Sequence, residues 1–115
     1  METEYTMHLE AGPFARIKQG TKKMEARLQD AKRLELKVGD TIRFVNIDDP
    51  TQVLRVEIIG LHAYISFAKL LDHFNSKYYF GSGRKEVLKR LRDRYKKREH
   101  ELGVLGILMK VIPEE

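Results

Sequence analysis

Cysteine is absent from this 115-residue sequence, which excludes disulfide bonds, thiolate metal sites and a cysteine nucleophile. Long apolar runs are also missing, so no segment resembles a membrane span, and the polar, acidic start METEYTMHLE lacks the core of a signal peptide. We therefore expect a cytoplasmic protein with no membrane partner. A hydrophobic fraction of 42% is typical of a globular chain, and the length predicts one domain over residues 1–115.

Several motifs of catalysis and cofactor binding are missing as well. The chain has no GxSxG, Walker A or GxGxxG pattern. Its four histidines, His8, His62, His73 and His100, form no HxH or HExxH pattern and have no carboxylate at the spacing of metal ligands. We therefore expect no metal site and no cofactor.

The positive charge of the chain is concentrated in one segment. The formal net charge of the whole sequence is +5, whereas residues 84–98 (RKEVLKRLRDRYKKR) contain nine Lys or Arg against two acidic residues. A helix of this composition is typical of a surface that contacts nucleic-acid phosphates. The residues expected to make these contacts are Lys89, Arg92, Lys96 and Lys97. A solvated helix surface with no ligand explains the charge equally well.

The hydrophobic pattern predicts an α+β domain. Five segments have the alternation or the β-branched composition of strands, namely residues 5–9, 24–28, 41–47, 52–65 and 102–112. Three segments have helical patterns, namely residues 12–20, 66–74 and 84–98. Residues 75–83 are predicted to be a loop, and Gly60 a bend or bulge. Short connections favour antiparallel pairing, so we expect a small curved sheet or barrel with flanking helices.

Residues 20–27 (GTKKMEAR) place three charged side chains close together. In residues 24–28 apolar side chains alternate with Glu25 and Arg27, so the strand is expected to be half-buried. The two charged side chains would leave its solvent face roughly 6–7 Å apart. Lys22 lies in the turn before the strand and can fold back over that face. The result would be a carboxylate flanked by two cations.

Such a cluster has a binding and a catalytic interpretation. Arg27, oriented by Glu25, could bind a phosphate or a polar base. A partly desolvated Lys22 would have a lowered pKa and could act as a base or a nucleophile. Because charged strand faces are common, the residues alone favour an ordinary solvated face, with a Glu–Arg pair worth less than ~1 kcal/mol.

The stretch GTKKMEAR at 20–27 resembles the GxKxxExR signature of the ASCH (activating signal cointegrator homology) domain family. VGDTIRF at 38–44 resembles the strand entry of that family. A helix ending in Tyr95, followed by ELGVLGILMKV at 101–111, is similar to its closing helix and strand. The likeness extends over residues 5–112.

The resemblance implies a PUA-like fold, which is a small, mostly antiparallel β-barrel with flanking helices, and an association with RNA binding. It also implies that the motif lines a cleft between the barrel and the helices. The ligand-binding residues would then be Gly20, Lys22, Glu25 and Arg27. We expect RNA or a nucleotide as the partner, and a monomeric protein.

Some relatives in this family are enzymes. One group hydrolyses the acetyl amide of acetylcytidine with a motif Lys, a motif Thr and a downstream acid. Lys22 matches that Lys, but Glu25 stands in the place of the Thr. Other relatives are linked to ribonuclease activity through a motif Lys and a Tyr, to which Lys22 and Tyr95 correspond. The catalytic residues of an enzyme would therefore be Lys22, Glu25 and Tyr95.

Three functions are compatible with the sequence. The favoured one is a binding module, in which the motif cleft takes a nucleotide or base and the basic helix contacts phosphates. The second is a small hydrolase acting on a modified nucleoside or on RNA, with Lys22 as the base. The third is a protein-interaction domain whose basic helix docks on an acidic partner.

Overall fold

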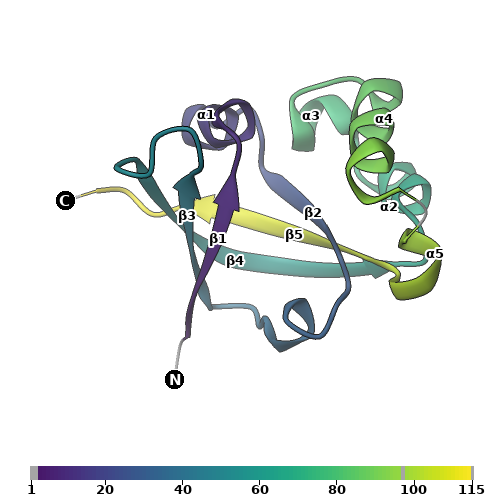
Figure 1. Cartoon of the computed structure of the whole chain (residues 1–115), viewed down its shortest axis with the longest axis horizontal. Coiled ribbons are helices and arrows are strands. Elements are labelled where there is room, and N and C mark those ends of the chain that lie inside the picture. The colour runs from purple at the N-terminus through teal and green to yellow at the C-terminus, as the bar shows by residue number, and fades with distance from the viewer. Residues whose placement is uncertain (1–2, 97, 115) are drawn as a thin grey trace.

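Across residues 3–96 and 98–114, which the computed structural model describes, five strands form one strongly curled sheet (Figure 1). They are β1 (Glu4–Leu9), β2 (Met24–Leu28), β3 (Thr41–Asn46), β4 (Val53–Tyr64) and β5 (Val104–Val111), in the spatial order β1-β3-β4-β5-β2. The β1–β3 pair is parallel and the other three pairs are antiparallel. This half-barrel with flanking helices confirms the predicted α+β fold class.

The α-helices lie in two places around the sheet. Their bounds are α1 (Ala11–Gln19), the 3-10 helix η1 (Arg33–Glu35), α2 (Phe67–His73), α3 (Ser76–Phe80), α4 (Arg84–Tyr95) and α5 (Glu99–Leu102). Helices α2 to α5 gather at one end of the long strands β4 and β5, whereas α1 lies apart from them, next to β1 and β3 (Figure 1). The start of β2 runs between these two groups of helices.

Two local predictions need correction. The segment 75–83 is not a loop throughout, because the side chain of Asn75 accepts a hydrogen bond from the Tyr78 N–H (3.0 Å) and so caps the short helix α3. Helix α4 ends at Tyr95 rather than at residue 98, since Lys96 has a positive φ of 57°. The predicted irregularity at Gly60 is confirmed by a register shift in the pairing of β4 with β5.

Two apolar clusters fill the space on either side of the sheet. The first lies inside the curl and includes Phe44, Ile58 and Ile107. The second lies between the sheet and helices α2 to α4, and includes Phe67 and Leu70. Strand β5 contributes side chains to both clusters, so this strand is covered on both faces.

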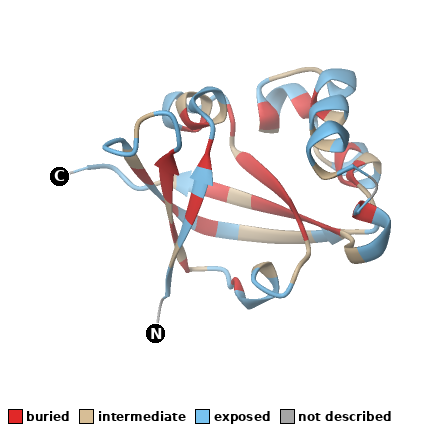
Figure 2. Cartoon of the chain, viewed as in Figure 1, coloured by how far each residue is buried: buried red, intermediate tan, exposed pale blue. Residues whose placement is uncertain are grey.

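Strand β2 is buried along its whole length, so the prediction of a half-buried strand is wrong (Figure 2). The alternation itself holds, because Met24, Ala26 and Leu28 all belong to the cluster beneath the helices. Glu25 and Arg27 pair with Ile107 and Leu105 of β5, whose side chains lie inside the curl. Directly paired residues share a face of the sheet, so the two charged side chains also point into the curl.

A buried carboxylate joins helices α2, α4 and α5. Glu99 accepts a hydrogen bond from the Phe67 N–H at the start of α2 (2.7 Å) and one from the Arg92 Nε–H of α4 (3.3 Å). Its side chain is 3% exposed. Glu99 therefore satisfies an N–H at a helix start that would otherwise be buried without a partner.

We expect Glu99→Ala to lower the free energy of unfolding by roughly 2 kcal/mol, because the Phe67 N–H and the Arg92 guanidinium both lose their acceptor. The matched control is Glu101→Ala, which removes an exposed carboxylate of the same helix whose ion pair with Arg98 spans 4.0 Å. Urea denaturation of both variants measures the difference. Equal losses in the two variants would contradict the structural role of Glu99.

Candidate ligand-binding site

A tight turn brings the motif lysine back toward the sheet. Helix α1 ends at Gly20, which has a φ of 86° that favours glycine. The carbonyl of Arg16 then accepts hydrogen bonds from the N–H groups of Thr21 and Lys22, both at 3.0 Å. The turn fixes the direction in which the chain enters β2. Gly20 thus acts through the backbone, as expected of a glycine just past a helix end.

The three charged side chains of the motif form one cluster. The Nζ atom of Lys22 lies 3.5 Å from Oε1 of Glu25. The Nη2 and Nε atoms of Arg27 donate to Oε2 of Glu25 at 3.1 and 3.3 Å. The predicted arrangement of a carboxylate between two cations is therefore confirmed.

Arg27 also connects the two edge strands of the sheet. Its Nη2 atom donates to the main-chain carbonyl of His8 in β1 at 3.2 Å. Since β1 and β2 stand at opposite ends of the strand order, this hydrogen bond spans the opening of the curled sheet. The guanidinium therefore closes the half-barrel while it orients Glu25.

The cluster is buried, in contrast to the solvated strand face that the residues alone favour. Lys22, Glu25 and Arg27 are 9%, 5% and 8% exposed. The ammonium of Lys22 lies 4.8 Å from the centroid of the Phe80 ring, which is close enough for a cation–π interaction. Phe80 is the last residue of α3, so the segment predicted to be a loop provides one wall of the lysine site.

Burial and mutual attraction shift the pKa values of all three groups. Burial lowers the pKa of Lys22, and the attraction of Glu25 offsets this only in part. Burial acts to raise the pKa of Glu25, but Lys22 and Arg27 outweigh it and hold that pKa below its ordinary value. For Arg27, Glu25 outweighs burial and raises the pKa. Glu25 is thus ionised at neutral pH, while Lys22 gives up its proton more readily than a surface lysine.

The cluster forms part of the floor of a pocket of about 610 Å³ between α1 and α4. The residues that line it are Glu10, Gly12, Pro13, Arg16, Lys22, Glu25, Ala26, Arg90, Leu91, Asp93 and Arg94. Arg94 of α4 pairs with Glu10, just before α1, at 3.0 Å, so an ion pair connects the two walls. A volume of this order is typical of small-molecule sites.

Two of the predicted ligand-binding residues contact this pocket directly and two do not. Lys22 and Glu25 line it, whereas Gly20 and Arg27 are not among its lining residues. Tyr95, predicted as a catalytic residue, does not line it either, because its ring stacks on Phe67 at 5.5 Å within the cluster beneath the helices. Tyr95 still lies near enough to Arg27 to contribute to the rise of its pKa.

The four residues predicted to contact phosphates lie away from this pocket or outside the described residues. Lys89 pairs with Asp93 at 2.9 Å, and Arg92 and Lys96 line a separate pocket of about 570 Å³. Lys97 lies outside the described residues. The face of α4 that looks into the motif pocket carries other cations.

The cations that line the pocket, besides Lys22, are Arg16, Arg90 and Arg94, and none of the three was among the predicted site residues. The spacing of Arg90 and Arg94 could have predicted that both lie on one face of the helix, since residues four apart are neighbours on a helix surface. Arg16 carried no such signal, because its position over the pocket depends on how α1 packs on the sheet.

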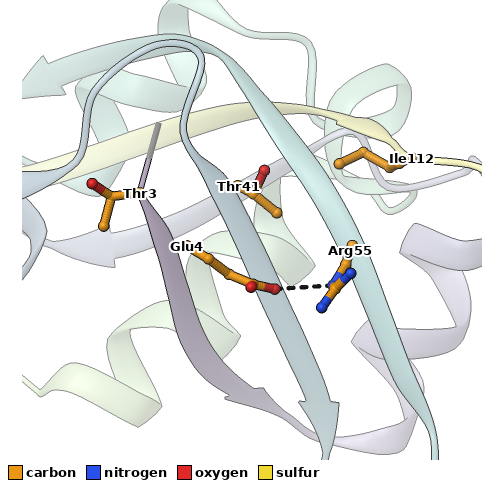
Figure 3. Close-up of a pocket in the computed structure, with 5 residues that line it drawn as sticks. All are labelled: Thr3, Glu4, Thr41, Arg55 and Ile112. Carbon is orange, nitrogen blue, oxygen red and sulfur yellow. Dashed lines mark ion pairs between the residues drawn. The ribbon is translucent and has the colours of Figure 1, made fainter. Parts of the chain in front are cut away.

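A second hollow, of about 250 Å³, lies at the beginning of β1 and β3 and is lined by Thr3, Glu4, Thr41, Arg55 and Ile112 (Figure 3). Its charged groups neutralise each other, because Nε of Arg55 lies 2.9 Å from Oε1 of Glu4. Both side chains are largely exposed. The motif cluster contacts the other end of β1, at His8. This second hollow therefore plays no part in the candidate site.

Within residues 3–96 and 98–114, no three His, Asp or Glu side chains gather in a way that could hold a metal ion. No helix in the described part of the chain is long and apolar enough to cross a membrane.

The curled sheet, the flanking helices and the buried Lys–Glu–Arg cluster together define an ASCH-type, PUA-like domain. The chain belongs to the ASCH domain family, whose model matches residues 7–104. A comparison with curated proteins finds no match.

Solved structures support the same fold. The crystal structure of the hypothetical protein PH0355 is 31% identical, with a TM-score of 0.84 over 96% of this chain and 100% of that one. The solution structure of protein PF0455 from Pyrococcus furiosus is 26% identical, with a TM-score of 0.76 over 97% and 100% of the two chains. An ASCH domain from Lactobacillus crispatus shares the fold at 15% identity, with a TM-score of 0.71 over 95% and 79%.

We expect Glu25→Gln to lower the free energy of unfolding at about pH 7 by roughly 3 kcal/mol, because it leaves two buried cations without an anion. The pKa of Glu25 in the folded protein lies below its ordinary value of 4.5. Just below pH 4.5 the unfolded chain therefore binds more protons than the folded chain. The contribution of the carboxylate is therefore complete above about pH 4.5 and is lost as the pH falls through the folded-state pKa.

Urea denaturation at about pH 7 and about pH 3 measures the free energy of unfolding of the parent and of Glu25→Gln. The difference between the two proteins should be smaller at about pH 3 than at about pH 7. Glu57→Gln, at an exposed position of β4, is the control and should show little loss at either pH. A gap of the same size at both pH values would contradict an ionic role for Glu25.

Proposed function

We propose that this ASCH domain binds RNA or a nucleotide, and that the ligand enters the pocket above Lys22 and Glu25. The observation that carries the proposal is the buried Lys–Glu–Arg cluster in the floor of a pocket of about 610 Å³. Burying three charges is costly, and a purely apolar strand would stabilise the fold at least as well. The association of the family with RNA binding agrees with a polar, anionic ligand.

The hydrogen bonds within the cluster leave Lys22 as the group that meets the ligand. Oε1 of Glu25 already accepts the N–H of Ala26 at 3.1 Å, and Oε2 accepts two hydrogen bonds from Arg27. An ammonium has three donors, and among the described residues Lys22 Nζ has Glu25 as its one ion-pair partner. Lys22 therefore retains donors for a base carbonyl or a phosphate oxygen.

The basic segment, residues 84–98, would supply the contacts to the RNA backbone. Lys89, Arg92, Lys96 and Lys97 are the residues proposed for this role. The ion pair of Lys89 with Asp93 is exposed, and exposed pairs are worth little, so a phosphate can replace the carboxylate. Arg92 is held by the buried Glu99, and its contribution is therefore expected to be smaller than that of Lys89.

We expect short single-stranded RNA to bind at low salt with an affinity that falls as salt rises, by a slope of about 0.7 in log–log units per phosphate contact. Lys89→Ala should reduce that slope by the amount of about one phosphate contact, because it removes one cation that would contact the RNA backbone. Lys22→Ala should weaken binding beyond the loss of one charge, because it removes the donor in the pocket. Fluorescence anisotropy over a salt series measures both effects. Binding that is absent at low salt, or unchanged at high salt, would sink the proposal.

A second candidate function is hydrolysis of a modified nucleoside or of RNA. The observation in its favour is the buried Lys22, whose pKa is lowered and whose partner Glu25 can orient it. Lys22 would act as the base, and Glu25 would position it. Tyr95 would act only through Arg27, since its ring is packed on Phe67.

If the domain is such a hydrolase, Lys22→Ala should reduce turnover of acetylcytidine or of short RNA by roughly 100-fold or more, because the proton acceptor is lost. Chromatography of the products at several pH values measures the rate. The control is Lys85→Ala, which removes an exposed cation of α4 outside the pocket. Equal turnover in the parent and Lys22→Ala would exclude Lys22 as the base.

A further inference from the structure

We propose that Arg16 and Arg90 form a phosphate subsite in the motif pocket, so that the preferred ligand is a nucleotide held by its phosphate as well as by its base. This inference rests on the proposed function and makes its ligand more specific. The two arginines belong to different walls of the pocket, Arg16 to α1 and Arg90 to α4.

Among the described residues, Arg16 is the arginine of the pocket that forms no ion pair. Its Nε atom is buried and has no hydrogen-bond acceptor among the described residues. Within that same part of the chain no carboxylate forms an ion pair with Arg16, whereas Arg94 pairs with Glu10. A buried donor without an acceptor is costly, and such groups in native proteins require an explanation. Arg16 also lines the pocket, so an anion bound there would balance the charge of its guanidinium.

Arg90 is held in position with part of its guanidinium still available. Its Nη2 atom donates to Glu86 at 2.7 Å and to Ser82 at 3.0 Å. Among the described residues these contacts engage only Nη2, so the other N–H groups of the fork can serve a ligand. Glu86 and Ser82 therefore fix the position of the Arg90 side chain without using all of its hydrogen-bond donors.

The two guanidinium groups lie within electrostatic range of each other. The pKa of Arg16 is lowered, first by burial and then by repulsion from Arg90, with weaker compensation from Glu86 and Glu25. Two cations that repel each other across a pocket form a favourable site for a phosphate, which accepts charge-assisted hydrogen bonds from both. The same anion would reduce the repulsion.

A glycine makes room for this arrangement. Gly12 lines the pocket in the first turn of α1, and a Cβ atom at this position would lie 3.3 Å from Nη1 of Arg16. The end of the Arg16 side chain would have to shift by a few tenths of an ångström to admit a Cβ atom. Gly12 therefore leaves space for the guanidinium where α1 borders the pocket.

The pocket is large enough for a nucleotide in the proposed orientation. Its volume of about 610 Å³ lies within the range typical of ligand sites. With the phosphate between Arg16 and Arg90, the base or ribose would meet Lys22 and Glu25 in the floor. A free nucleotide and the 5′ end of an RNA chain carry the same phosphate chemistry, so the experiment must separate the two.

The test is calorimetric titration with cytidine, cytidine 5′-monophosphate, inorganic phosphate, and a short RNA with and without a 5′-phosphate. We expect the parent to bind the monophosphate roughly ten-fold or more tighter than cytidine, and Arg16→Gln to lose most of that difference. Arg90→Gln should also reduce the preference for the monophosphate over cytidine. The control Arg55→Gln removes the same charge from the second hollow and should retain the full preference.

A preference for 5′-phosphorylated RNA over the monophosphate would identify a chain end as the source, and the reverse would identify a free nucleotide. If cytidine and RNA bind but a phosphate does not raise the affinity, the phosphate subsite is wrong and the proposed function stands. The same conclusion follows if Arg16→Gln keeps the preference for the monophosphate over cytidine. If phosphate binds through Arg16 while cytidine and RNA do not bind, the subsite stands and the proposed function fails. If no ligand binds, both are overturned.

Discussion

The ion pair between Glu25 and Arg27 is the interaction on which the rest of the structure depends. Arg27 gives two hydrogen bonds to Glu25 and a third to the His8 carbonyl, so a single guanidinium connects β2 to β1 across the opening of the sheet. Glu25 in turn holds the ammonium of Lys22. The closure of the half-barrel and the shape of the candidate site are therefore consequences of one charge network.

The network explains why a strand with two charged side chains can be buried on both faces. Burial would strongly disfavour any one of these charges alone, but each is paired and hydrogen-bonded within the cluster. The same arrangement leaves Lys22 with spare donors at the floor of the pocket, while Glu25 and Arg27 are occupied by each other. The part of the network that is fully hydrogen-bonded stabilises the fold, and the Lys22 ammonium, which keeps spare donors, faces the motif pocket.

The cations of the basic segment are divided between ion pairs and two separate pockets. Four of its cations form ion pairs with acidic side chains, namely Lys89, Arg90, Arg92 and Arg94. The partner of Arg92 is the buried Glu99. Two faces of α4 must therefore be distinguished. One carries Arg90 and Arg94 into the motif pocket, and the other carries Arg92 toward a separate pocket, which Lys96 just past the helix also lines.

The sequence by itself determined what depends on local pattern. Alternation in residues 24–28 placed Glu25 and Arg27 together on one face, Gly20 marked the end of α1, and the spacing of the motif indicated the ASCH family. Only the tertiary structure decided whether that face is exposed, because its burial depends on the curl of the sheet, which brings Arg27 of β2 to His8 of β1. It also decided that Phe80 lies beside the Lys22 ammonium and that Arg90 lines the same pocket as Lys22, since Phe80 and Arg90 are distant from Lys22 in sequence and no local pattern encodes these positions.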